Sequence, residues 1–309
     1  MLTFVNYLRT YFNSGFHWAP HLCAALFLAL AISANYYWDF YNRVTEHYYK
    51  KPISVIFLFC FYAFAFLVAT AIVSYFKKEK RPLFNRKYLL FGLIGIAFLS
   101  LDSSYYLMKF ADSFLPANPY VQDWMKSLLS NLSSFITVII PLYVVYFGVK
   151  HFKPEFYGMR LNGAKVLPYF WLILFMIPLM YLASFRPDFL ETYPTYDDHF
   201  EYRFLNTEQW ITAGLYELTY GFDFISVELF FRGFLVVALS RFVGKDALIP
   251  MVVVYAFLHF GKPAGEAISS IFGGYILGIL AYQSRNIFGG LVAHLGVAWG
   301  MEYFAYLQG

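Results

Sequence analysis

The sequence is poor in charge and in cysteine. Of its 309 residues, 14% are charged and 60% are hydrophobic, whereas a water-soluble domain has about 25% charged and about 45–50% apolar residues. This composition excludes an ordinary soluble protein and a disordered chain. The 2 cysteines, Cys23 and Cys60, lie in apolar runs and are predicted to be buried thiols, forming neither a disulfide framework nor a metal–thiolate site. The net charge of +4 is small, which argues against nucleic acid as a partner.

Long apolar runs, in contrast, are plentiful. A bilayer core of about 30 Å requires about 20 apolar residues per helix. Segments near this length predict an all-α polytopic membrane helix bundle of eight or nine transmembrane helices, at residues 20–38, 53–76, 88–107, 126–147, 166–185, 222–241, 246–261, 266–284 and 287–307. The first is interpreted as a retained anchor and not a signal peptide, because Arg9 is the only Lys or Arg before it. We expect an integral protein of a bacterial cytoplasmic membrane, with membrane lipid as one partner.

The charges between the predicted spans alternate in sign. Basic residues gather in two loops, which contain Lys77, Lys78, Lys80, Arg81, Arg86 and Lys87 in one and Lys150, Lys153, Arg160 and Lys165 in the other. Acidic residues dominate the stretch 186–208, with Asp188, Glu191, Asp197, Asp198, Glu201 and Glu208. Because short loops rich in Lys and Arg stay in the cytoplasm, both basic loops are predicted to be cytoplasmic and the acidic stretch to lie on the opposite side, where it is a candidate lid.

Ionisable side chains at membrane depth are a feature of the C-terminal third. Glu228, Arg232, His259 and His294 lie within predicted apolar helices, where such groups are costly unless paired or hydrated and indicate function by default. Glu228 and Arg232 are four residues apart and share one helix face. Taken alone, they are interpreted as a buried ion pair that stabilises the helix, and His259 alone is interpreted as an interfacial residue.

His294 lies in mid-span without a polar neighbour in sequence, so it must find a partner on another helix. Small residues at four-residue steps would let helices approach closely enough; they are Ser270, Gly274, Gly278, Gly296 and Gly300. Glu228 lies near the start of one predicted span and His259 near the end of the next, antiparallel one. A tight bundle around these polar groups is therefore predicted.

Together, these residues resemble the CAAX-protease and bacteriocin-processing (CPBP/Abi) family of intramembrane proteases. The family pattern has Glu-Glu-x-x-x-Arg-Gly on one helix, aromatic-x-x-x-His on the next and His-x-x-x-Asn on the last. The matching residues are Glu228, Arg232, Gly233, Tyr255, His259 and His294. The resemblance implies that residues 206–309 form the protease core of a single membrane domain 1–309, to which residues 1–205 add accessory transmembrane helices and the acidic loop. It also implies hydrolysis of a membrane-associated peptide or protein substrate.

Two positions depart from the family pattern. Val227 stands where the family has the first glutamate, thought to activate the attacking water together with the second-motif histidine. Ala298 stands where the family has an asparagine that is thought to stabilise the oxyanion. Residues four apart share a helix face, so Asp223 and Glu302 each lie one turn from a missing group.

The sequence therefore supports a hypothesis with two candidate bases. Either Glu228 or Asp223 would deprotonate water, while His259 holds that water and His294 donates to the developing oxyanion. The expected catalytic residues are Glu228, His259, His294 and Asp223, with Arg232 and Glu302 organising the site. The alternative for Asp223 is a plain interfacial residue at a helix entrance.

Other functions remain open at this point. Two histidines and a carboxylate could hold zinc, but the His-Glu-x-x-His spacing is lacking, so no cofactor is favoured. A catalytically silent homologue that acts as a membrane scaffold, or as an immunity or binding protein, is an alternative that Val227 and Ala298 motivate. A transporter is a weaker alternative, because the two halves show no inverted repeat.

Overall fold

A computed structural model describes residues 2–79, 81–149, 152, 156–161, 165–196 and 200–308, and every regular element in them is helical. The α-helices are α1 (Leu2–Asn13), α2 (Trp18–Trp38), α3 (Phe40–Tyr48), α4 (Pro52–Tyr75), α5 (Arg86–Ser103), α6 (Met108–Ala111), α7 (Pro119–Ser134), α8 (Ile140–Gly148), α9 (Phe170–Ala183), α10 (Pro187–Leu190), α11 (Glu201–Phe204), α12 (Gln209–Glu228), α13 (Ser240–Val243), α14 (Leu248–Leu258), α15 (Ala264–Ser284) and α16 (Phe288–Tyr306). Two π-helices, η3 (Phe135–Ile139) and η6 (Leu229–Ala238), continue α7 and α12. Short 3-10 turns are η1 (Pro82–Phe84), η2 (Asp112–Phe114), η5 (Leu167–Tyr169) and η7 (Gly244–Ala247).

Five of the described helical segments are long and apolar enough to cross a membrane: Trp18–Trp38, Pro52–Tyr75, Arg86–Phe114, Pro119–Gly148 and Ala264–Ser284. Leu167–Ala183 is a shorter apolar helix. The prediction of an all-α polytopic membrane bundle is confirmed. The predicted span 222–241 differs in its bounds, because the helix already begins at Gln209 and runs through η6.

The predicted span 246–261 is α14, a helix of 11 residues. At 1.5 Å per residue it is about 16 Å long, about half the thickness of a bilayer core. Every residue from Leu248 to Phe257 is buried by protein, so this helix needs no lipid around it. It packs mainly against α4 and α15 and forms the centre of the bundle.

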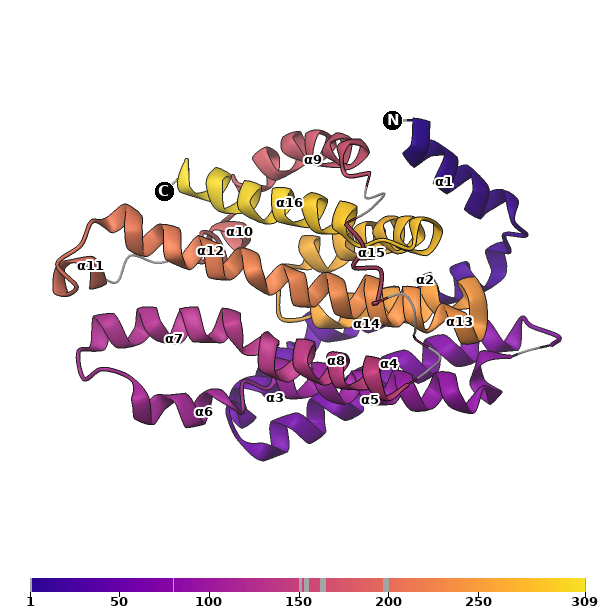
Figure 1. Ribbon diagram of the computed structural model, residues 1–309, viewed down its shortest axis with the longest axis horizontal. Coiled ribbons are helices and arrows are strands. Elements are labelled where there is room, and N and C mark those ends of the chain that lie inside the picture. The colour runs from indigo at the N-terminus through magenta and orange to yellow at the C-terminus, as the bar shows by residue number, and fades with distance from the viewer. Residues whose placement is uncertain are drawn as a thin grey trace.

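The loops divide between two ends of the bundle (Figure 1). Contacts at the basic end are Lys77 to Asp246 at 2.6 Å, Arg285 to Ser240 at 2.8 Å and Asn286 to the Arg160 carbonyl at 2.5 Å. Contacts at the other end are Thr195 to Glu302 at 2.7 Å and Trp124 to the Thr212 carbonyl at 3.2 Å. The basic loops thus meet at one end and the acidic stretch lies at the other, as the charge pattern predicts. Lys80, Lys150, Lys153, Asp197 and Asp198 lie outside the described residues.

Small residues let the helices around α14 and α16 approach closely. A methyl group added at Gly278 would lie 2.6 Å from Met251 of α14, and one added at Gly296 would lie 2.4 Å from Ile173 of α9. Real Cβ atoms do not approach this closely, so a larger residue at either position would force the Met251 or Ile173 side chain to shift. The four-residue pattern of small residues has the packing role that the sequence predicts.

Large apolar side chains cover the outside of the bundle. On α2, Trp18, Leu22, Leu26 and Leu30 recur every four residues and are 63–69% exposed, which is the pattern of a lipid-facing stripe. Cys23 and Cys60 are also exposed, so the prediction that they are buried was wrong. An apolar run in a membrane helix contains both lipid-facing and protein-facing positions, and it does not distinguish them.

Candidate active site

Glu228 lies at the junction of α12 and the π-helix η6, and its side chain is 0% exposed. A π-helix has wider turns than an α-helix and is frequent at functional sites. The carboxylate fits because α16 has a glycine opposite it. A Cβ atom at Gly290 would lie 2.6 Å from Glu228 Oε2, so only a residue without a side chain leaves this space.

One oxygen of Glu228 interacts with two partners. Its Oε1 atom lies 3.0 Å from Nη1 of Arg232, which is 1% exposed, and 2.9 Å from Nδ1 of His294. The ion pair on one helix face is present as the sequence predicts, and His294 finds its partner across helices. Because a carboxylate only accepts hydrogen bonds, Nδ1 of His294 carries the hydrogen, and Nε2 of the neutral ring keeps its lone pair.

Tyr255 of α14 and His259, which directly follows this helix, complete the group. The Tyr255 hydroxyl lies 3.3 Å from His294 Nε2, and the Tyr255 ring lies 4.3 Å below the Arg232 guanidinium. His259 donates from Nδ1 to the Tyr255 carbonyl at 2.8 Å, which leaves its Nε2 unprotonated in the neutral ring. His259 is only partly buried and is close enough to His294 for the two to interact electrostatically.

Asp223 lies one turn before this group on α12. Its Oδ1 atom accepts a hydrogen bond from Ser226 Oγ at 3.2 Å, and it is within electrostatic range of His294 and of Asp102. Asp102 in turn accepts a hydrogen bond from Thr137 at 2.5 Å. Asp223 therefore lies beside the site with polar partners of its own, which differs from an interfacial position at a helix entrance.

Glu302 is engaged elsewhere. Its two oxygens accept hydrogen bonds from the backbone N–H of Thr195 at 2.8 Å and from the Thr195 hydroxyl at 2.7 Å. It therefore anchors the acidic stretch to α16. A second anchor lies nearby, where the Tyr193 hydroxyl donates to Glu266 of α15 at 3.0 Å. Burial raises the pKa of Tyr193, so this phenol stays a donor at physiological pH.

The site has two features that the sequence reasoning missed. The hydroxyl of Tyr255 was not considered, because the family pattern requires only an aromatic ring at that position. Gly290 was not among the small residues expected to pack, although the pair Gly289-Gly290 precedes His294 by one turn. Both signals are visible in the sequence, but their meaning depends on which helices are neighbours.

The donor set does not fit a zinc ion. Among the described residues, no group of three or more His, Cys, Asp or Glu side chains could hold a metal. Moreover, Glu228 is paired with the positive charge of Arg232 at 3.0 Å, and a second cation at the same oxygen would be repelled.

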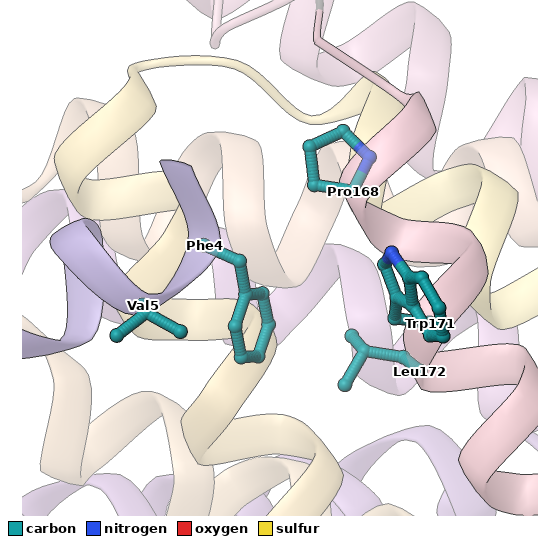
Figure 2. A pocket seen from close by; sticks show the side chains of 5 residues that line it. All are labelled: Phe4, Val5, Pro168, Trp171 and Leu172. Atoms are coloured by element: carbon teal, nitrogen blue, oxygen red, sulfur yellow. The ribbon is translucent and has the colours of Figure 1, made fainter. Parts of the chain in front are cut away.

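An apolar cavity of about 160 Å³ lies apart from this site, between α1 and the start of α9. Figure 2 shows its lining side chains, Phe4, Val5, Pro168, Trp171 and Leu172. They include no acid or base, so this cavity has no side chain for acid–base catalysis.

Comparison with known proteins finds a family match in the part of the chain that forms this site. Residues 210–300 match the model of the Rce1-like family, described as type II CAAX prenyl endopeptidase Rce1-like. No curated protein and no solved structure matches the chain. The matched residues extend from α12 into α16 and include Glu228, Tyr255, His259 and His294. The predicted resemblance to CAAX proteases is confirmed: the C-terminal part of this integral membrane protein is similar to a family of intramembrane proteases.

Proposed function

We propose that the protein is an intramembrane endopeptidase in which the Glu228–His294 pair activates a water molecule. The observation that carries the proposal is the 2.9 Å contact between Glu228 Oε1 and His294 Nδ1. A buried carboxylate that accepts the Nδ1 hydrogen orients the imidazole and stabilises it once it is protonated. His294 Nε2 is then the base.

This division of roles differs from the hypothesis made on sequence alone. Glu228 is 0% exposed, and its Oε1 atom is already shared by Arg232 and His294, so we assign it the role of supporting the base. His259 keeps its expected role, because its Nε2 lone pair is available to accept a hydrogen bond from the water. Asp223 remains the alternative base.

The reaction is a direct attack of water on a peptide carbonyl. The water oxygen bonds to the carbonyl carbon while one proton passes to His294 Nε2, and the carbonyl oxygen becomes an oxyanion. When the tetrahedral intermediate collapses, the C–N bond breaks and the proton passes from His294 to the leaving amine. A positioned base of this kind contributes typically 10²–10⁴-fold in rate.

The family description, which names a CAAX prenyl endopeptidase, supports a proposal for the substrate class. We propose a membrane-associated peptide that ends in a prenylated cysteine motif, cleaved in a bacterial cytoplasmic membrane. Residues 206–309 would supply the core and residues 1–205 the accessory helices. These accessory helices include α4, which packs against α14 and thereby supports Tyr255 and His259.

The competing proposal is a silent homologue that binds a membrane partner. It rests on Val227 and Ala298, which lack the polar groups of the family pattern. In that case restoration of the pattern by Val227→Glu with Ala298→Asn would create cleavage where the wild-type protein has none.

The test uses the purified full chain in phospholipid nanodiscs and an internally quenched peptide that ends in a farnesylated CAAX motif. The wild-type protein should cleave it, and His294→Ala and His259→Ala should each abolish turnover while the thermal unfolding of the bundle stays close to that of the wild type. Cleavage by both variants at the wild-type rate would refute the peptidase proposal. Absence of cleavage by the wild type, followed by its appearance in the restored variant, would favour the silent homologue.

A further inference from the structure

The Tyr255 hydroxyl is a buried polar group that a purely structural aromatic residue would not need. Tyr255 is 4% exposed. Its ring is fixed on two sides, by the Arg232 guanidinium at 4.3 Å and by Gly274, where an added Cβ would lie 2.8 Å from the ring. The hydroxyl is therefore held in one place, 3.3 Å from His294 Nε2.

The direction of this hydrogen bond follows from the other side of the imidazole. Because His294 Nδ1 donates to Glu228, Nε2 of the neutral ring is an acceptor, and the Tyr255 hydroxyl must be the donor. Because Nε2 has only one lone pair, the attacking water must take the place of the Tyr255 hydroxyl there before its proton is transferred. The Tyr255 hydrogen is then free when negative charge develops on the substrate oxygen.

Ala298 leaves the oxyanion role of the family pattern vacant. It is 1% exposed and carries only a methyl group, so it has no hydrogen to donate. Of the polar groups around His294, Glu228 only accepts hydrogen bonds and is paired with Arg232. Tyr255 supplies a neutral O–H donor directly beside the base.

We propose that the Tyr255 hydroxyl donates the hydrogen bond that stabilises the oxyanion of the tetrahedral intermediate, in the role that Ala298 cannot fill. The inference rests on the proposed peptidase function. The hydroxyl stays protonated throughout, since it only shifts its hydrogen bond from His294 Nε2 to the substrate oxygen. A donor that bonds more strongly to the oxyanion than to the uncharged carbonyl accelerates the reaction with little effect on substrate binding.

The first test is Tyr255→Phe, which removes only the hydroxyl. With the farnesylated quenched peptide, kcat should fall by about 10²-fold, the usual effect of losing one oxyanion donor, while KM changes less than about twofold. Tyr275→Phe on α15 is the matched control, because the Tyr275 hydroxyl bonds to Tyr11 at 3.1 Å and to His21 at 2.7 Å. That variant should keep the wild-type kcat.

The second test separates an oxyanion donor from a structural support. It compares two inhibitors of the same peptide sequence. A farnesylated phosphinate peptide carries a tetrahedral centre with a charged oxygen, whereas a farnesylated reduced-amide peptide lacks that oxygen. Tyr255→Phe should weaken inhibition by the phosphinate about as much as it lowers kcat and leave inhibition by the reduced amide unchanged. Equal weakening of both, or an unchanged kcat, would overturn the inference. If the wild type neither cleaves the peptide nor binds the phosphinate, it is the proposed function that fails.

Discussion

Neutralising Glu228 should destabilise the protein far more than neutralising Glu228 and Arg232 together. The two side chains are 0% and 1% exposed and lie 3.0 Å apart. Glu228→Gln keeps the shape and an acceptor for His294 but leaves the Arg232 charge buried without a counter-charge. Breaking a buried pair from one side costs about 3–5 kcal/mol, whereas replacing both partners by neutral groups of similar volume is often neutral.

The measurement is the free energy of unfolding in mixed detergent micelles for Glu228→Gln, for Arg232→Met and for the double variant. Each single variant should lose about 3–5 kcal/mol and the double variant should recover most of it. Hydrolysis should not recover, because the base has lost the carboxylate that stabilises its protonated form. Single-variant losses below about 1 kcal/mol, as for an exposed pair, would contradict the geometry on which the site is built.

Three further outcomes are expected. Gly290→Ala places a methyl group 2.6 Å from Glu228 Oε2 and should reduce kcat by at least about tenfold by displacing the carboxylate. The control Gly273→Ala, whose methyl group meets nothing within 4 Å, should keep the wild-type kcat. Equal kcat values for the two variants would exclude the displacement. Asp223→Asn should lower kcat much less than Glu228→Gln, since Asp223 bonds to Ser226. A larger loss of kcat for Asp223→Asn than for Glu228→Gln across a pH–rate profile would identify Asp223 as the base. Thr195→Val removes one hydrogen bond to Glu302, worth about 1 kcal/mol, and should speed amide hydrogen exchange in residues 187–196 without unfolding α16. Unchanged exchange would show that the Thr195 hydroxyl does not hold the acidic stretch.

Periodicity and charge were enough to predict much of this bundle. The pairing of Glu228 with Arg232 depends on helix geometry alone, and the need of His294 for a distant partner follows from the cost of a lone polar group in lipid. The choice of Glu228 or Asp223 as the base, and the role of Glu302, could not be settled in the same way. All three satisfy a four-residue rule, and only the neighbour relations of α12, α16 and the acidic stretch separate them.

The same reason explains the errors. Cys23 and Cys60 were predicted to be buried because they lie in apolar runs, but in a membrane helix the lipid is as good an environment for an apolar side chain as the protein interior. The helix that bears Glu228 begins at Gln209, earlier than the predicted residue 222, because Glu217 interrupts the hydrophobic pattern without interrupting the helix. The apolar pattern of a helix indicates its environment, whereas the position at which the helix begins depends on its backbone hydrogen bonds.

The buried cluster of Glu228, Arg232 and His294 also bears on whether the site is active. An ion pair between Glu228 and Arg232 is sufficient to neutralise the charge at the start of η6, and an apolar residue of similar size in place of His294 would fill the same space at no electrostatic cost. A structural role therefore accounts for the glutamate and the arginine, but it does not account for an imidazole whose Nδ1 is held by Glu228 and whose Nε2 faces the Tyr255 hydroxyl at 3.3 Å. Base catalysis requires an imidazole whose Nδ1 is fixed by a carboxylate and whose unprotonated Nε2 can accept a proton. For this reason the geometry favours hydrolysis over a silent scaffold even though Val227 and Ala298 depart from the family pattern.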